Sequence, residues 1–234
     1  MTLFLFDIVK YLRIPLLVIL FIVTHTAYSS ELKAKDVENK ELALALKYAL
    51  LSEPLALKPF QLNDQNNKPF GLDQLKGKWT FMYFGYTSCP DVCPTTIDEL
   101  NIVSRKLAED HRFEKDTRYV FVSVDPYRDT PEMLKNFTAY FEFNLFGAVA
   151  PVEDLNKLTD QLGVMHRRLI VQDRETKQQE YAVEHSSYIY LIDPQGRAVA
   201  RFSPPHYGKE IKQLYVKIRQ QQTTNNVEGK AGGA

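Results

Sequence analysis

The chain has only two cysteines and no excess of positive or negative charge. Each of these absences excludes a class of protein. Two cysteines cannot build the framework of several disulfide bonds that holds small secreted domains together. Lys and Arg together number 29, as do Asp and Glu, so the formal net charge is +0. Because no positive excess attracts phosphate backbones, we expect no nucleic-acid partner.

No apolar run reaches the length of about 20 residues that a membrane-spanning helix requires. The unbroken apolar run Ile14–Val23 follows the basic residues Lys10 and Arg13, which is the order found in an export signal. Leu3–Phe6 could lengthen this run into an anchor that is not cleaved. We therefore expect residues 1–29 to be an export signal or a membrane anchor, and the rest of the chain to lie outside the cytoplasm.

The remaining composition suits one packed domain. Hydrophobic residues make up 44% of the 234 residues, with 14 Phe and 13 Tyr, which is ample material for a core. Mixed charges and leucines in residues 30–55 predict a stalk or linker, and the polar, Gly-rich residues 223–234 predict a disordered tail. The domain itself is expected over residues 56–222.

Strand and helix patterns alternate along this domain. Trp79–Tyr86 predicts a strand buried on both faces, and a loop with both cysteines separates it from a helix marked by apolar residues between Ile97 and Leu107. A second buried strand, Tyr119–Val124, precedes a helix with Thr130 as its N-cap. Further strands are expected at 146–150, 164–171, 187–192 and 198–202, further helices at 153–162 and 209–221, and an exposed hairpin or loop at 172–180. This order predicts an α/β fold with a central sheet.

Cys89 and Cys93 stand where the first buried strand gives way to a helix. A bridge between them would close a very short loop and stabilise the fold little, so a chemical role is the better explanation. Pro94 at the first helical position would put Cys93 at the positive end of the helix dipole, which favours the thiolate. Thiolates select soft metals, and two are too few for an iron–sulfur cluster or structural zinc. Copper is therefore expected, with a disulfide or redox pair as the alternative.

A third ligand can be located from topology. Sites in parallel α/β sheets collect at the carboxyl edge of the strands, where Cys89 and Asp125 lie. An antiparallel strand over Ser187–Ile192 would begin at that edge, which places His185 beside the cysteines. Asp125 and Asp129 are expected either as turn and cap residues or as groups behind the ligands that orient them.

The segments Gly85–Pro94, Ser123–Thr130 and Glu184–Ser187 together resemble the Sco/SenC family of copper chaperones, over roughly residues 57–220. The resemblance implies a thioredoxin-like fold, with a central mixed sheet flanked by helices and an extra β-hairpin. It implies copper bound by Cys89, Cys93 and His185, with Asp125 as the acidic residue after the second strand. Glu184 stands where the family commonly has Asp, which keeps the negative charge.

The same resemblance implies a role in building the copper site of cytochrome c oxidase. The partners would be the copper-bearing subunit of the oxidase and other periplasmic copper chaperones or thiol reductants. The N-terminal segment, if uncleaved, would attach the chain to the membrane. We expect a location on the periplasmic side of the bacterial inner membrane, because an acid-containing N-terminus is untypical of mitochondrial transit peptides.

Two enzyme classes compete with the carrier hypothesis. A thiol-disulfide oxidoreductase would also use Cys89 and Cys93 as low-pKa thiols. Thioredoxins, however, have two residues between their cysteines and a cis-proline before the antiparallel strand. Here three residues intervene, no proline lies between Pro151 and Pro194, and His185 occupies that region. A peroxiredoxin-type peroxidase is disfavoured because its Pro-x-x-x-Thr/Ser-x-x-Cys motif is absent before Cys89.

Overall fold

The computed structural model describes residues 31, 33, 35–172 and 179–231. The chain divides into two units, Met1–Ala45 and Leu46–Ala234. In the first unit residues 35–45 are helical, and the expected export segment 1–29 lies outside the described residues. Among the helices that the structure does describe, none combines the length and the apolar character that a membrane crossing requires.

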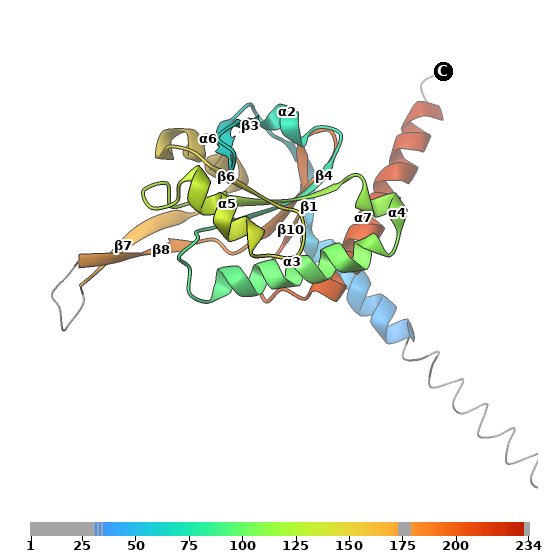
Figure 1. Cartoon of the computed structure of the whole chain (residues 1–234). Coiled ribbons are helices and arrows are strands. Elements are labelled where there is room, and N and C mark those ends of the chain that lie inside the picture. The colour runs from blue at the N-terminus through green and yellow to red at the C-terminus, as the bar shows by residue number, and fades with distance from the viewer. Residues whose placement is uncertain (1–30, 32, 34, 173–178, 232–234) are drawn as a thin grey trace, which may run out of the picture. The chain divides into compact units, whose positions relative to one another are not determined.

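A mixed eight-stranded sheet forms the centre of the second unit (Figure 1). Its strands, in spatial order, are β1 (Leu50–Ala56), β10 (Arg197–Phe202), β9 (Ile189–Ile192), β4 (Trp79–Gly85), β5 (Thr117–Ser123), β6 (Leu145–Val149), β2 (Gln61–Asp64) and β3 (Pro69–Gly71). Strands β4, β5 and β6 run parallel, whereas β9 is antiparallel to β4, as the sequence pattern predicts. Strand β1 lies in the expected linker, yet it pairs with β10 and belongs to the sheet.

The described helices that follow β1 are α2 (Leu72–Leu75), α3 (Val92–Ala108), α4 (His111–Glu114), α5 (Pro131–Ala139), α6 (Val152–Leu162) and α7 (Gly208–Ala231). The predicted cap of α5 is confirmed, because Thr130 Oγ1 accepts a hydrogen bond from Met133 N at 3.2 Å. Helix α7 continues to Ala231, through residues expected to form a disordered tail. Among the residues whose burial is described, Ile218 is the last buried apolar residue of the helix, and the polar sequence after it made the end appear earlier.

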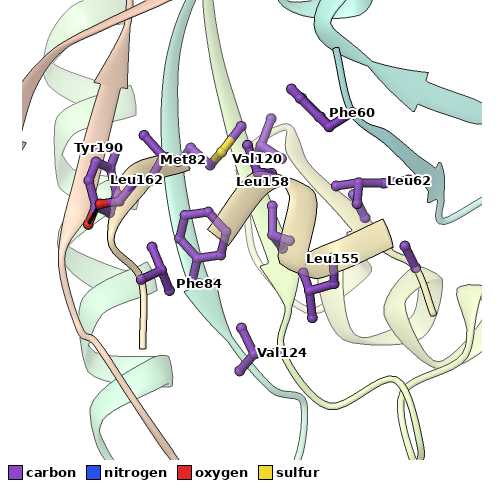
Figure 2. Close-up of a cluster of buried hydrophobic side chains, with 14 of the residues drawn as sticks. Phe60, Leu62, Met82, Phe84, Val120, Val124, Leu155, Leu158, Leu162 and Tyr190 are labelled. Carbon is purple, nitrogen blue, oxygen red and sulfur yellow. Dashed lines mark hydrogen bonds between the residues drawn. The ribbon is translucent and has the colours of Figure 1, made fainter. Parts of the chain in front are cut away.

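The core that supports the site lies between α6 and one face of the sheet. All seven residues of β4 are buried, in agreement with the continuous apolar run. Figure 2 shows Leu155 and Leu158 of α6 among Phe84 and Val120 of the two central strands, with Tyr190 of β9 nearby. Because both faces of β4 are packed, the strand delivers its carboxyl end to a fixed position.

The expected extra hairpin is present. Strands β7 (His166–Gln172) and β8 (Gln179–His185) form a two-stranded antiparallel sheet of their own, which extends from the main body in Figure 1. His166 and His185 face each other across this pair. The hairpin therefore carries His185 at the end of β8 that adjoins β9.

Candidate metal centre

The cysteines occupy the connection from β4 to α3. Helix α3 begins at Val92 with Asp91 as N-cap, so the expected start at Pro94 is late and Cys93 lies within the first turn. Gly85 ends β4 directly beneath this turn. A Cβ atom on Gly85 would lie 2.7 Å from Cys93 Sγ and 2.8 Å from the Phe121 ring, so only glycine allows the buried sulfur to approach the strand so closely.

His185 meets the two cysteines as the topology predicts. The candidate ligand atoms of Cys89, Cys93 and His185 all lie within 4.8 Å of one another, and His185 Nε2 is 3.5 Å from Cys93 Sγ. His185 Nδ1 donates to the Ser186 carbonyl oxygen at 3.1 Å. This bond fixes the tautomer that leaves a lone pair on Nε2, the atom that faces the sulfurs.

The two thiols differ in burial and in acidity. Cys93 is 0% exposed, whereas Cys89 is partly exposed, and both are free thiols. The neighbouring Cys93 thiol, followed by His185 and by the backbone N–H groups of Asp91 and Cys93, holds the pKa of Cys89 far below its ordinary value, although partial burial opposes this shift. Its closeness to Cys89, together with burial, raises the pKa of Cys93. The prediction that Cys93 is the thiolate is therefore wrong, because burial and the neighbouring Cys89 outweigh the effect of the helix N-terminus on Cys93.

Asp125 lies behind the site rather than in contact with its ligand atoms. Its side chain is buried, accepts a hydrogen bond from Arg128 Nε, and accepts another from the Tyr181 hydroxyl at 2.9 Å. Tyr181 belongs to β8, the strand that ends in His185. Asp125 thus connects the end of β5 to the hairpin, which agrees with an orienting role and adds a contact that the sequence did not reveal.

Asp129 holds the cysteine loop in place. Its buried carboxylate accepts hydrogen bonds from Thr87 N at 2.9 Å, from the Thr87 hydroxyl and from the Ser123 hydroxyl. These bonds join the start of the loop before Cys89 to the end of β5. Of the two alternatives for Asp129, its contacts fit a group behind the candidate ligands, because they tether the cysteine loop to the end of β5.

Sequence reasoning missed two aromatic neighbours of the site. The Tyr83 hydroxyl donates to Cys93 Sγ at 3.6 Å, and burial raises the pKa of Tyr83 above its usual range. The Tyr86 ring packs edge-on against the His185 ring, with centroids 5.8 Å apart. The sequence did contain a signal for Tyr83, because a tyrosine in a strand buried on both faces needs a hydrogen-bond partner for its hydroxyl.

The other histidines lie elsewhere. His166 Nε2 is 3.1 Å from Asn156 Oδ1 on α6, and His206 Nε2 donates to the Ser187 carbonyl oxygen at 2.8 Å. His25 is outside the described residues. Within the described ranges, Cys89, Cys93 and His185 are the group of three such side chains whose ligand atoms converge.

Comparisons with known proteins agree with this architecture. The family model described as SCO1/SenC matches residues 50–221. The SCO2-like protein of Rickettsia prowazekii is 36% identical over 157 residues, which cover 67% of this chain and 74% of that protein. The copper-bound structure of Bradyrhizobium japonicum ScoI has 33% identity and a TM-score of 0.60, and that of Arabidopsis thaliana ScoI has 30% identity and a TM-score of 0.62. Both alignments cover 70% of this chain and 98% of the other. With its thioredoxin-like fold, the chain belongs to the SCO1/SenC family.

Proposed function

We propose that this protein is a copper carrier that binds the metal through Cys89, Cys93 and His185. The observation that supports this most directly is the convergence of two sulfurs and one imidazole nitrogen within 4.8 Å. Two thiolates and an imidazole suit Cu(I), which prefers soft ligands and accepts a low coordination number. Copper is the cargo in this proposal, so the function is to exchange copper with other proteins and not to catalyse a reaction.

Loading such a site has a defined proton balance. Cys89 is already held as a thiolate, whereas Cys93 carries the proton that it donates to Cys89. Cys93 must lose this proton before its sulfur can bind copper. His185 can bind through the Nε2 lone pair, so its coordination releases no further proton. Copper uptake at neutral pH should therefore release about one proton per site.

We propose that the cargo is delivered to the copper-bearing subunit of cytochrome c oxidase, on the periplasmic side of the bacterial inner membrane. Family membership supports this role, and proteins named SCO1 and SCO2 of yeast mitochondria are among the relatives. The partly exposed Cys89 gives an acceptor's ligands a route to the site. Other periplasmic copper chaperones or thiol reductants would load or reduce the site, and the N-terminal segment would hold the chain at the membrane.

One observation favours a second candidate, a thiol-disulfide oxidoreductase. An exposed thiolate beside a buried thiol is the arrangement in which the first cysteine attacks a disulfide and the second resolves the mixed disulfide. Cys89 and Cys93 have these properties. The role of His185 separates the two hypotheses, because thiol exchange does not require it as a ligand.

The test compares copper binding with disulfide reduction. The full chain is reduced, titrated with Cu(I) under anaerobic conditions, and its metal-to-protein ratio is measured for the wild type, Cys93→Ser and His185→Ala. His166→Ala serves as the matched control, because His166 lies opposite His185 in the same hairpin. We expect one copper per chain in the wild type and in His166→Ala, and weaker binding in the other two. Unchanged copper affinity in His185→Ala would show that His185 is not a copper ligand. Insulin reduction without copper binding would favour the oxidoreductase.

A second measurement tests delivery. The loaded protein is mixed with the copper-free soluble domain of the oxidase subunit, and copper in each protein is measured after separation. Movement of copper to the subunit is the expected result. Copper that remains on the carrier would contradict delivery to this partner.

A further inference from the structure

The hairpin that carries His185 has little support of its own. Among the described residues, β7 and β8 pair with each other and with no strand of the main sheet. A two-stranded hairpin alone is marginally stable in water. Cys89 and Cys93, in contrast, belong to the connection between β4 and α3. The separation between His185 and the sulfurs therefore depends on how the hairpin is attached to the body.

Arg128, in the loop between β5 and α5, provides such an attachment. Its Nε donates to Asp125, and its Nη1 donates to the Tyr181 carbonyl oxygen of β8 at 3.3 Å. The guanidinium lies 4.0 Å from the centroid of the Tyr181 ring. The Tyr181 hydroxyl in turn donates to the same carboxylate at 2.9 Å, so three residues form a closed set of contacts.

A second set of contacts leads from Arg128 to the imidazole itself. The guanidinium lies 5.5 Å from the centroid of the Tyr86 ring, and this ring packs edge-on against His185. The Tyr86 hydroxyl also lies near the backbone of Val183 in β8, which lowers the pKa of Tyr86, although burial raises it more. Arg128 therefore contacts both the strand that holds His185 and the ring that packs against it.

The geometry demands an arginine. A planar guanidinium can bond a carboxylate and a carbonyl oxygen while it stacks on two rings, whereas the ammonium of lysine cannot. The remaining nitrogen, Nη2, is buried without a hydrogen-bond partner among the described residues, which is an unfavourable state. The contacts of Arg128 with the loop and the hairpin must therefore outweigh the cost of this unpaired donor.

We propose that Arg128 is a positioning residue that fixes His185 against Cys89 and Cys93 by clamping the β7–β8 hairpin to the loop after β5. This inference rests on the proposed copper function for its effect, but the clamp itself is a property of the metal-free chain. A variant that lacks the Arg128 contacts still contains Cys89, Cys93 and His185. Its His185 imidazole, however, is free to move relative to the two sulfurs.

The experiment uses the full chain with Arg128→Lys and Arg128→Gln, and Arg219→Lys as the matched control. Arg219 makes a comparable pair with Asp116, at 2.8 Å for each guanidinium nitrogen, and stacks near Trp79 at the other end of β4. Cu(I) affinity is measured by competition with a chelator. The thiolate-to-Cu(II) absorption band is recorded after loading with Cu(II). Amide hydrogen exchange of β8 is followed in the metal-free protein.

Both Arg128 variants should bind Cu(I) at least about tenfold more weakly, the usual effect of losing a group that orients a ligand, and should shift the thiolate-to-Cu(II) band. Their β8 amides should exchange faster than in the wild type. Arg219→Lys should leave the affinity, the band and β8 exchange unchanged, even if its thermal midpoint falls. Wild-type affinity, band and exchange in both Arg128 variants would overturn the inference, as would equal changes in Arg219→Lys. If the wild type binds no copper, the proposed function fails, and β8 exchange still decides whether the clamp exists.

Discussion

His185 Nε2 lies 3.5 Å from Cys93 Sγ, although 92 positions separate the two residues in the chain. Local structure cannot bring together two residues so far apart in the sequence. The entropy lost in closing this loop is offset only by the contacts that form when the sheet and the hairpin have both folded. The three candidate ligands therefore converge only in the folded chain. Metal binding should accordingly stabilise the fold, since the unfolded chain has no equivalent site.

The acidity of Cys89 predicts its reactivity. An ordinary cysteine has a pKa of about 8.5, so its alkylation slows roughly tenfold for each pH unit below that value. The folded-state pKa of Cys89 is strongly lowered by the Cys93 thiol, so its thiolate persists as the pH falls. We expect iodoacetamide to modify Cys89 at a nearly constant rate from pH 8 down to pH 5, while Cys93 stays unmodified. Peptide mass spectrometry identifies the modified residue. A rate that follows a midpoint near 8.5 at Cys89 would contradict the assignment of the thiolate.

Gly85→Ala should displace the buried sulfur. The new Cβ would lie 2.7 Å from Cys93 Sγ, and no real Cβ contact is that short. Overpacking of this kind lowers the free energy of unfolding by about 1–3 kcal/mol, and here it should also weaken copper binding. Gly147→Ala is the control, because its Cβ would meet Leu134 and Thr138 at 3.1 Å, away from the cysteines. Urea unfolding and copper titration measure the two effects, and unchanged copper affinity in Gly85→Ala would show that the sulfur can shift without loss.

Asp129→Ala should loosen the cysteine loop. The substitution leaves the donors of Thr87 and Ser123 without their acceptor, which reduces stability by about 1–3 kcal/mol for each buried group left unpaired. Asp193→Ala removes a similarly buried carboxylate, one that accepts from Gln195 N and Arg197 N at the β9–β10 turn. Both variants should lose thermal stability, but only Asp129→Ala should weaken copper binding. Equal copper affinity in the two would mean that the tether does not position the loop.

Glu184→Ala should have little effect, although Glu184 directly precedes His185. Its carboxylate pairs with Arg167 across the hairpin, and both side chains are more than half exposed. Exposed ion pairs of this kind contribute about 0–1 kcal/mol to stability. We expect copper affinity and the thiolate-to-Cu(II) band to match the wild type. A large change in either would show that the Glu184 carboxylate acts on the site despite its exposure.

The sequence predicted the parts of the site that follow from strand order. The apolar run at β4 identified the central strand, and the antiparallel β9 brought the residues before it to the edge where Cys89 lies. The choice of His185 among five histidines follows from that topology alone. Thr130 was recognisable because a cap followed by proline is a local signal.

The sequence could not predict contacts between side chains of distant segments. The start of α3 at Val92 was missed because Pro94 is equally acceptable a little later in the first turn. The ionised thiol was assigned to Cys93 from the helix dipole, whereas the close approach of the two thiols, which no sequence pattern shows, lowers the pKa of Cys89. The Arg128 clamp depends on where Tyr181 lies, and no pattern in the sequence indicates that.

The unequal burial of the two sulfurs sets an order for ligand replacement. Cys93 is enclosed by β4 and α3, so an approaching thiol from another protein has access only to the side on which Cys89 lies. If copper is carried as proposed, the buried Cys93 would be the last of the three ligands that an acceptor could replace. A handover in this order would keep the metal bound to protein ligands at every stage, so that it would not enter bulk solvent.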